Sequence, residues 1–209
     1  MALVTQAPDG RQAQYLWYST DRGRSFQAGG PAPVLPNPGV NDFRDPKVIW
    51  DADCDRWFMV NAEAQKLGFY ASPDLRSWQR VGEFQRNYLG VLECPDIFCI
   101  TADDGTSHWV LGTSANGKGR GLPATYAYWT GAFDGSSFTP YRPEPEWLDY
   151  GFDFYGAVTY PVFFTTARLA LSVDGRHPPV PERILLSSTE IGGFRRLLQT
   201  TPFWSMKHA

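Results

Sequence analysis

The sequence contains few of the residues that build metal sites and disulfide frameworks. It has 3 cysteines and 3 histidines among 209 residues. Cys54, Cys94 and Cys99 are too few and too irregularly spaced for a disulfide framework or a zinc site. The histidines are scattered, and no carboxylate lies near them at metal-ligand spacing. We therefore expect neither a metal ion nor a cofactor.

Long apolar runs and runs of basic residues are also missing. The formal net charge is −3, with acids and bases interspersed. These features predict no nucleic-acid partner and no membrane span. Residues 1–5 have no basic region, apolar core or cleavage site, so no signal peptide is predicted. The compartment stays unassigned, because a longer relative could be secreted or cytoplasmic.

Aromatic residues, glycine and proline are abundant. Phe, Trp and Tyr make up 15% of the chain, alongside 20 glycines and 17 prolines. This mixture is typical of short aromatic strands joined by tight turns. The composition therefore predicts an all-β fold.

A nine-residue pattern recurs along the chain. In each copy a strand leads into a polar turn, and an aromatic residue begins the next strand, which predicts an outer hairpin. The copies are residues 18–26, 70–78 and 130–138, with a weaker one at 186–194. A second predicted strand precedes three of these hairpins, at residues 57–60, 109–112 and 168–171.

An acid-led strand precedes each of those second strands. These strands begin at Asp45, Glu93 and Asp153, and Asp45 and Glu93 are 48 positions apart. Four strands in roughly 40–50 residues is the period of a β-propeller blade. A β-sandwich with coincidental turn motifs is the alternative. The recurrence of three strand types in the same order favours the propeller.

The repeats predict about four blades of a five-bladed propeller family. The predicted blades cover about residues 1–40, 41–85, 86–145 and 146–196, so a partial propeller spans 1–196 and a tail spans 197–209. The first of these blades lacks its innermost strand. Open blade edges predict self-association of the chain.

The acids at the strand starts suggest glycoside chemistry. Glycoside hydrolysis generally uses two carboxyl groups, one as proton donor and one as nucleophile or base. An isolated Glu93 would be an ordinary surface residue, but acids recur at the corresponding positions of three repeats. Arg44 beside Asp45 forms either an ion pair at a strand start or a donor–acceptor pair for vicinal sugar hydroxyls.

These motifs resemble glycoside hydrolase family 32, which contains invertases, inulinases and levanases. Residues 44–46 read Arg-Asp-Pro and residues 93–95 read Glu-Cys-Pro, which are similar to two motifs of that family. Residues 18–23, 41–43 and 147–155 also resemble family segments, in family order. The resemblance implies a five-bladed propeller, usually followed by a β-sandwich, that hydrolyses β-fructofuranosides with retention.

The resemblance also implies roles for individual residues. Glu93 matches the general acid/base, and Asp45 matches the transition-state stabiliser. Arg44 would bind fructose hydroxyls, and Cys94 would tune Glu93. The substrate would be a fructose-containing oligosaccharide or polysaccharide.

The chain also departs from the family pattern. Asp153 and Tyr155 lie in a matching segment near the expected site, but the resemblance fades after Tyr160. The family nucleophile is the Asp of an Asn-Asp-Pro motif, and this sequence contains none; Asp42 precedes Phe43 instead of proline. No room remains for the sandwich. We interpret the sequence as a truncated reading frame.

Two hypotheses of function follow from these observations. One is a β-fructosidase that acts on sucrose, levan or inulin, or a fructosyl-transferring relative. The other is a non-catalytic remnant, either a fructan-binding module or a product with no independent role. The sequence distinguishes neither the fructan nor hydrolysis from transfer. Because the nucleophile motif is missing, we expect these 209 residues alone to have little or no hydrolytic activity.

Overall fold

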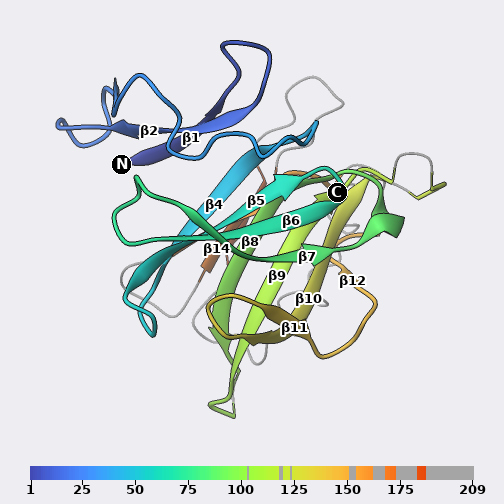
Figure 1. Cartoon of the computed structure of the whole chain (residues 1–209). Coiled ribbons are helices and arrows are strands. Elements are labelled where there is room, and N and C mark those ends of the chain that lie inside the picture. The colour runs from blue at the N-terminus through green and yellow to red at the C-terminus, as the bar shows by residue number, and fades with distance from the viewer. Residues whose placement is uncertain are drawn as a thin grey trace.

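The described part of the chain is built almost entirely from β-strands (Figure 1). A computed structural model describes residues 1–102, 104–117, 120–122, 124–150, 154–161, 168–172 and 183–186. The one helical element in these ranges is the short 3-10 helix η1 (Asn87–Leu89). The prediction of an all-β fold is confirmed. No helix in the described residues is long and apolar enough to cross a membrane.

The described strands form four antiparallel sheets. The first sheet contains β1 (Ala2–Gln6), β2 (Ala13–Tyr18) and β3 (Gln27–Ala28). The second contains β4 (Arg44–Asp51), β5 (Arg56–Glu63), β6 (Lys66–Ser72) and β7 (Gln79–Gln85). The third contains β8 (Leu92–Thr101), β9 (Ser107–Ala115), β10 (Thr125–Phe133), β11 (Phe138–Pro140) and β12 (Glu146–Trp147). The fourth contains β13 (Val158–Pro161), β14 (Arg168–Ser172) and β15 (Arg183–Leu186).

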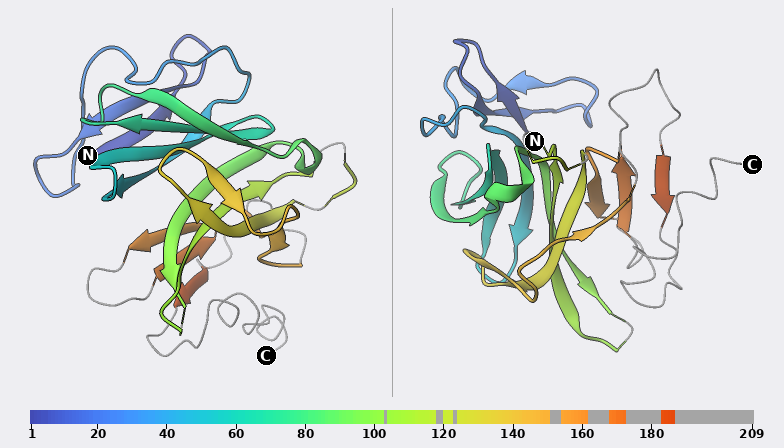
Figure 2. Two further views of the ribbon diagram at one scale, coloured as in Figure 1. Left: turned by 60° about the horizontal axis from the view of Figure 1, so that its bottom comes forward. Right: turned by 90° about the vertical axis from the view of Figure 1, so that its right-hand side faces the viewer.

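Strands that are consecutive in sequence are neighbours within each sheet, apart from β12, which pairs with β10. In the second and third sheets the order is the predicted one: an acid-led strand, a second strand and an outer hairpin. The first strands of the sheets contact one another in the order β1, β4, β8 and β13. The right-hand view of Figure 2 shows the second, third and fourth sheets in succession. The number of propeller blades stays a prediction.

One predicted strand begins later than expected. The sequence places a strand start at Asp153, which lies outside the described residues, whereas β13 begins at Val158. Residues 154–157 are not in a strand. Gly156 has a φ of 72°, and its N–H donates to Ser114 Oγ at 2.8 Å. This segment is therefore bound to the third sheet through a side chain before it enters the fourth sheet.

The main core lies between the second and third sheets. Phe58 and Phe69 from the second sheet are fully buried with Trp129 from the third. The Phe58 ring lies 4.6 Å from that of Phe133, between ring centroids. At Gly82 a β-carbon would lie 2.2 Å from the backbone oxygen of Ser136, so the two sheets approach too closely there for a larger residue.

Smaller cores join the remaining sheets. Leu35 and Phe43 from the segment between β3 and β4 pack with Met59 and Tyr70 of the second sheet. Val110 of the third sheet packs with Phe154 ahead of the fourth. Leu3 of β1 packs against the first of these clusters, so the two clusters extend the main core to the chain segments on either side of it.

The recurring hairpin turns share one hydrogen-bonding arrangement. Asp74 Oδ1 accepts from the backbone N–H of Arg76 and Ser77 at 2.9 and 2.8 Å. Asp21 and Asp134 accept backbone N–H groups of their own turns in the same way. An Asp side chain that satisfies turn amides favours the turn over extended backbone. This explains why the motif recurs along the sequence.

Candidate functional site

The candidate site is built on two matching β-bulges. The register of β4 against β5 shifts between Arg44 and Lys47, and Asp45 within it has a φ of 59°. The register of β8 against β9 shifts between Glu93 and Asp96, and Cys94 has a φ of 46°. Positive φ is uncommon for residues other than glycine, and bulges of this kind re-aim side chains next to functional sites.

The bulges correct the alignment of the two repeats. The sequence comparison matched Asp45 with Glu93, but the structure matches Arg44 with Glu93 and Asp45 with Cys94. Both pairs are 49 positions apart. The comparison of acidic residues placed the two repeats one residue out of register. The reason is that the equivalent positions carry an arginine in one repeat and a glutamate in the other. Asp45 and Glu93 therefore enter the site from successive positions of equivalent bulges.

Arg44 joins the two sheets at this site. Its Nη2 lies 2.8 Å from Glu93 Oε1, and its Nε lies 3.9 Å from Asp45 Oδ2. Arg44 Nη1 also forms an ion pair with Asp42. Burial disfavours the guanidinium, but hydrogen bonds to Asp42 and Glu93 outweigh this and raise the pKa of Arg44 above its usual value. One cation thus balances three carboxylates that remain partly open to solvent.

Asp45 is held on two sides, by a backbone N–H at its carboxylate and by a side-chain hydroxyl at its own N–H. Its Oδ2 accepts the N–H of Cys94 at 3.0 Å, and its own N–H donates to Thr5 Oγ1 at 3.2 Å. The Cys94 thiol lies 3.8 Å from the same carboxylate oxygen. Burial and the nearby charges of Asp45 and Glu93 raise the pKa of Cys94 to about 12. The thiol is therefore protonated at neutral pH and can donate to Asp45.

Tyr155 reaches the site from the segment before β13. Its hydroxyl donates to Glu93 Oε2, the carboxylate oxygen that Arg44 does not contact. Burial and the hydrogen bond to Glu93 raise the pKa of Tyr155 well above its usual value. The structure thus brings together Arg44, Asp45, Glu93, Cys94 and Tyr155. Asp153, also predicted at the site, lies outside the described residues.

Side chains that the sequence did not single out support the site. Gln14 is fully buried; its Nε2 donates to Phe43 O at 2.9 Å, and its Oε1 accepts from Thr5 Oγ1 at 2.7 Å. Gln12 Oε1 accepts the N–H of Phe43 at 2.8 Å. These glutamines fix the backbone just before Arg44. No pattern within the first repeat distinguishes them from other polar residues in or beside a strand.

Lys47 and Asp96 were also missed, although the sequence contains a signal for them. Each directly follows the proline of its bulge, so the two hold equivalent positions with opposite charges. Their side chains meet at 2.9 Å.

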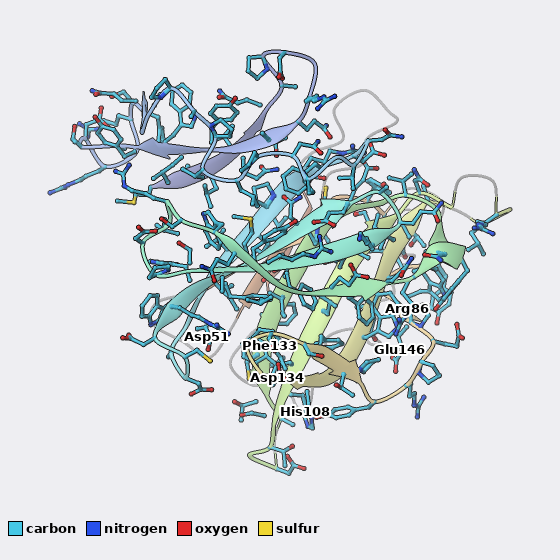
Figure 3. All side chains as sticks on the ribbon, viewed as in Figure 1. Asp51, Arg86, His108, Phe133, Asp134 and Glu146 are labelled. Carbon is cyan, nitrogen blue, oxygen red and sulfur yellow. The ribbon has the colours of Figure 1, made fainter. Side chains whose placement is uncertain are left out.

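Other acidic residues lie away from the site. Asp51 and Asp134, labelled in Figure 3, lie near the other end of β4 from Arg44. The described residues contain no group of three or more potential ligands able to hold a metal ion.

This arrangement offers sugar hydroxyls both donors and acceptors. Arg44 supplies guanidinium N–H groups, while Asp45 and Glu93 supply carboxylate oxygens. A carboxyl group held by an arginine and a tyrosine hydroxyl is fixed in place without a metal ion. The site is therefore suited to binding a polyhydroxylated ligand and to proton transfer at one of its oxygens.

Sequence comparison matches this chain to one protein family and to several named relatives. The family model described as "Glycosyl hydrolases family 32 N-terminal domain" matches residues 1–172. A levanbiose-producing levanase of Geobacillus stearothermophilus is 56% identical over 162 residues, which cover 77% of this chain and 41% of the levanase. An extracellular exo-inulinase of Aspergillus niger is 36% identical over 173 residues, covering 72% of this chain and 32% of the inulinase. The chain thus spans less than half the length of these curated relatives.

Solved structures with the same fold carry related names. The fructofuranosidase of Schwanniomyces occidentalis, solved in complex with fructose, superimposes with a TM-score of 0.73 at 28% identity. The match covers 82% of this chain and 35% of that one. The exo-inulinase of Aspergillus awamori superimposes with a TM-score of 0.71 at 28% identity, covering 88% of this chain and 42% of that one.

Proposed function

The chain belongs to glycoside hydrolase family 32, and from this premise we propose that it acts on β-fructofuranosides by a retaining mechanism. Sucrose, levan and inulin are the substrate types in question. The network around Arg44 carries the proposal, because it ties Glu93 to Asp42 and holds Asp45 beside Cys94. Two acids from neighbouring sheets thereby share one site.

We assign a role to each residue of the network. Glu93 is the general acid/base that protonates the leaving oxygen. Asp45 stays ionised and stabilises positive charge that develops on the fructosyl ring in an oxocarbenium-like transition state. Arg44 binds fructose hydroxyls, and Cys94 and Tyr155 hold the two carboxylates. Asp153 is proposed as a further substrate-binding residue.

We propose that the four sheets are blades of an incomplete five-bladed propeller. The blades cover about residues 1–40, 41–85, 86–145 and 146–196, and 197–209 form a tail. In support, the first strands of the sheets contact one another in chain order. Val4 on β1 is 38% exposed. β1 is an edge strand of the first sheet, and its open edge supports self-association of these 209 residues, which light scattering after size-exclusion chromatography tests.

The nucleophile is the missing component of the proposed reaction. The 209 residues contain no Asn-Asp-Pro motif, so a polypeptide with these residues alone should release little or no fructose. This favours a second candidate function, fructan binding without turnover. A fructosyl-transferring relative would differ in products, since a sugar would then replace water as the acceptor.

One experiment separates these functions. The chain is incubated with sucrose, levan and inulin, and fructose and transfer products are measured. Binding of levanbiose is followed by NMR. Arg44→Met is expected to abolish binding, and Tyr150→Phe, at a side chain that is 85% exposed, is the matched control.

Each outcome decides between the candidates. Binding without product release supports the fructan-binding function for these residues. Product release that Glu93→Gln abolishes would contradict the expected inactivity and support the hydrolase. If neither binding nor turnover of any fructoside is detected, the proposal is refuted.

A further inference from the structure

A buried ion pair lies where three sheets meet, and the reaction proposed above makes no use of it. Lys47 Nζ, from β4, lies 2.9 Å from Asp96 Oδ1, from β8. The Asp96 side chain is 1% exposed. A buried pair of charges costs free energy unless its geometry is good and further hydrogen bonds satisfy it. The further hydrogen bonds of Lys47 and Asp96 therefore indicate which part of the chain the ion pair keeps in place.

Both partners bind the same residue of the fourth sheet. Lys47 Nζ donates to the carbonyl oxygen of Thr159 at 2.6 Å. The N–H of Thr159 donates to Asp96 Oδ2 at 2.5 Å. Both backbone polar groups of Thr159 are thus bound by one ion pair. We call Lys47, Asp96 and Thr159 the clamp.

The clamp lies just beyond the residue that contacts Glu93. Tyr155 is four positions before Thr159, and its hydroxyl donates to Glu93 Oε2. Between them, the N–H of Gly156 donates to Ser114 Oγ. Residues 154–157 are not in a strand, so the hydrogen bonds of Gly156 and Thr159, together with the packing of Phe154 and Ala157 on the third sheet, determine where Tyr155 lies.

We propose that Lys47 and Asp96 are positioning residues, which hold the segment before β13 so that Tyr155 orients the Glu93 carboxyl group. The clamp side chains reach Glu93 only indirectly in this proposal. It acts through Thr159 and Tyr155. Its catalytic meaning rests on the proposed function, but the contact between Tyr155 and Glu93 can be tested without turnover.

The surroundings of Asp96 agree with a fixed clamp. Asp96 pairs with Gly112 across the β8–β9 ladder. A β-carbon at Gly112 would lie 2.5 Å from the Tyr126 hydroxyl oxygen, so glycine allows this ring to lie against the strand. Tyr126 is buried, and burial and the charge of Asp96 raise its pKa well above the usual value. A neutral aromatic side chain thus covers the Asp96 side of the ion pair.

The test measures the ¹³Cζ chemical shift of Tyr155, which reports donation by the phenol to a carboxylate. Tyr155→Phe assigns the resonance. Glu93→Gln gives its position when the carboxylate acceptor is lost, and Tyr150 gives the value for an exposed phenol. The test variant is Asp96→Ala, measured near pH 7. Its expected effect is a shift of the Tyr155 resonance most of the way to the position found in Glu93→Gln.

The matched control is Asp51→Ala. Asp51 is also a buried acid beside a cation, with Oδ2 lying 3.7 Å from Arg56 Nε, but it is at the other end of β4. A general loss of stability would move both variants alike, whereas the clamp predicts that only Asp96→Ala shifts the Tyr155 resonance. An unchanged Tyr155 resonance in folded Asp96→Ala would overturn the proposal, as would equal shifts in the two variants.

A second variant covers the case in which Asp96→Ala does not fold. Lys47→Met combined with Asp96→Leu removes both charges and leaves neither unpaired, and it should shift the Tyr155 resonance in the same direction. Levanbiose titration of the unmodified chain keeps the two proposals apart. If the chain binds no fructoside but Tyr155 still depends on Asp96, the proposed function fails and the clamp stands.

Discussion

Replacing Phe58 by alanine tests the packing on which the relative placement of the second and third sheets depends. Phe58 is fully buried in β5. Its ring centroid lies 5.4 Å from that of Phe69 in the same sheet and 4.6 Å from that of Phe133 in the third. The substitution therefore opens a cavity directly between the sheets that carry Asp45 and Glu93.

The expected loss is large relative to the total stability of a domain. Truncation of a buried Phe to Ala costs about 3–5 kcal/mol. Two aromatic contacts of about 0.5–1.5 kcal/mol each place this site in the upper part of that range, at about 4–5 kcal/mol. Since a domain of this size is stable by about 5–15 kcal/mol, the variant should be close to its unfolding threshold.

Urea unfolding followed by tryptophan fluorescence measures this loss. The midpoint should fall while the slope with denaturant stays unchanged, because the same surface is exposed on unfolding. Tyr150→Ala is the control, since its side chain is 85% exposed, and it should change the free energy of unfolding by less than about 0.5 kcal/mol. A loss below about 1.5 kcal/mol for Phe58→Ala would refute the described packing, because it falls well short of the usual range.

Three further predictions follow from the structure. Gly82→Ala should destabilise the chain by about 1–3 kcal/mol in urea unfolding because of its close approach to Ser136, whereas Gly30→Ala, at a position with open space, should not. The pKa of Asp21 is lowered to about 2 by hydrogen bonds from Ser25, and turn amides also lower the pKa of Asp74 and Asp134. Because these pKa values lie below those of the unfolded chain, the stability they provide is present above about pH 4 and is lost as pH falls toward 2. Asp74→Asn should flatten that dependence in urea midpoints measured from pH 2 to 7, and an equal effect of Asp53→Asn would contradict this. At pH 8, mass spectrometry should find that iodoacetamide alkylates Cys54 faster than Cys94. A hydrogen bond with Asp51 raises the pKa of Cys54, but this thiol is exposed, whereas the pKa of about 12 leaves Cys94 almost no thiolate. Equal rates would count against the described partial burial of Cys94.

The strand order was predictable because its signals are local. Asp21, Asp74 and Asp134 mark turns whose hydrogen bonds lie within a few residues. An aromatic residue marks the start of the strand that follows each turn. Such patterns do not depend on distant parts of the chain, so the hairpins and the strands before them could be placed from sequence.

The site was only partly predictable because its geometry depends on long-range contacts. The motifs identified Arg44, Asp45, Glu93 and Cys94, but not which of them are equivalent. A bulge adds a residue to one strand, and its position depends on backbone pairing that side-chain types do not reveal. The two prolines were the better guide, since Pro46 and Pro95 hold the same place in their bulges.

The matching bulges have a consequence for how such a molecule can change over evolutionary time. The same backbone bend presents Arg44 and Asp45 in one sheet and Glu93 and Cys94 in the next. The bend thus tolerates side chains of opposite charge and different size. After duplication of a sheet, single substitutions at these two positions could change a binding pair into a proton donor with its neighbour, with no change in the path of the chain. Copies of one unit could in this way acquire different chemical tasks while each kept the packing that made it stable.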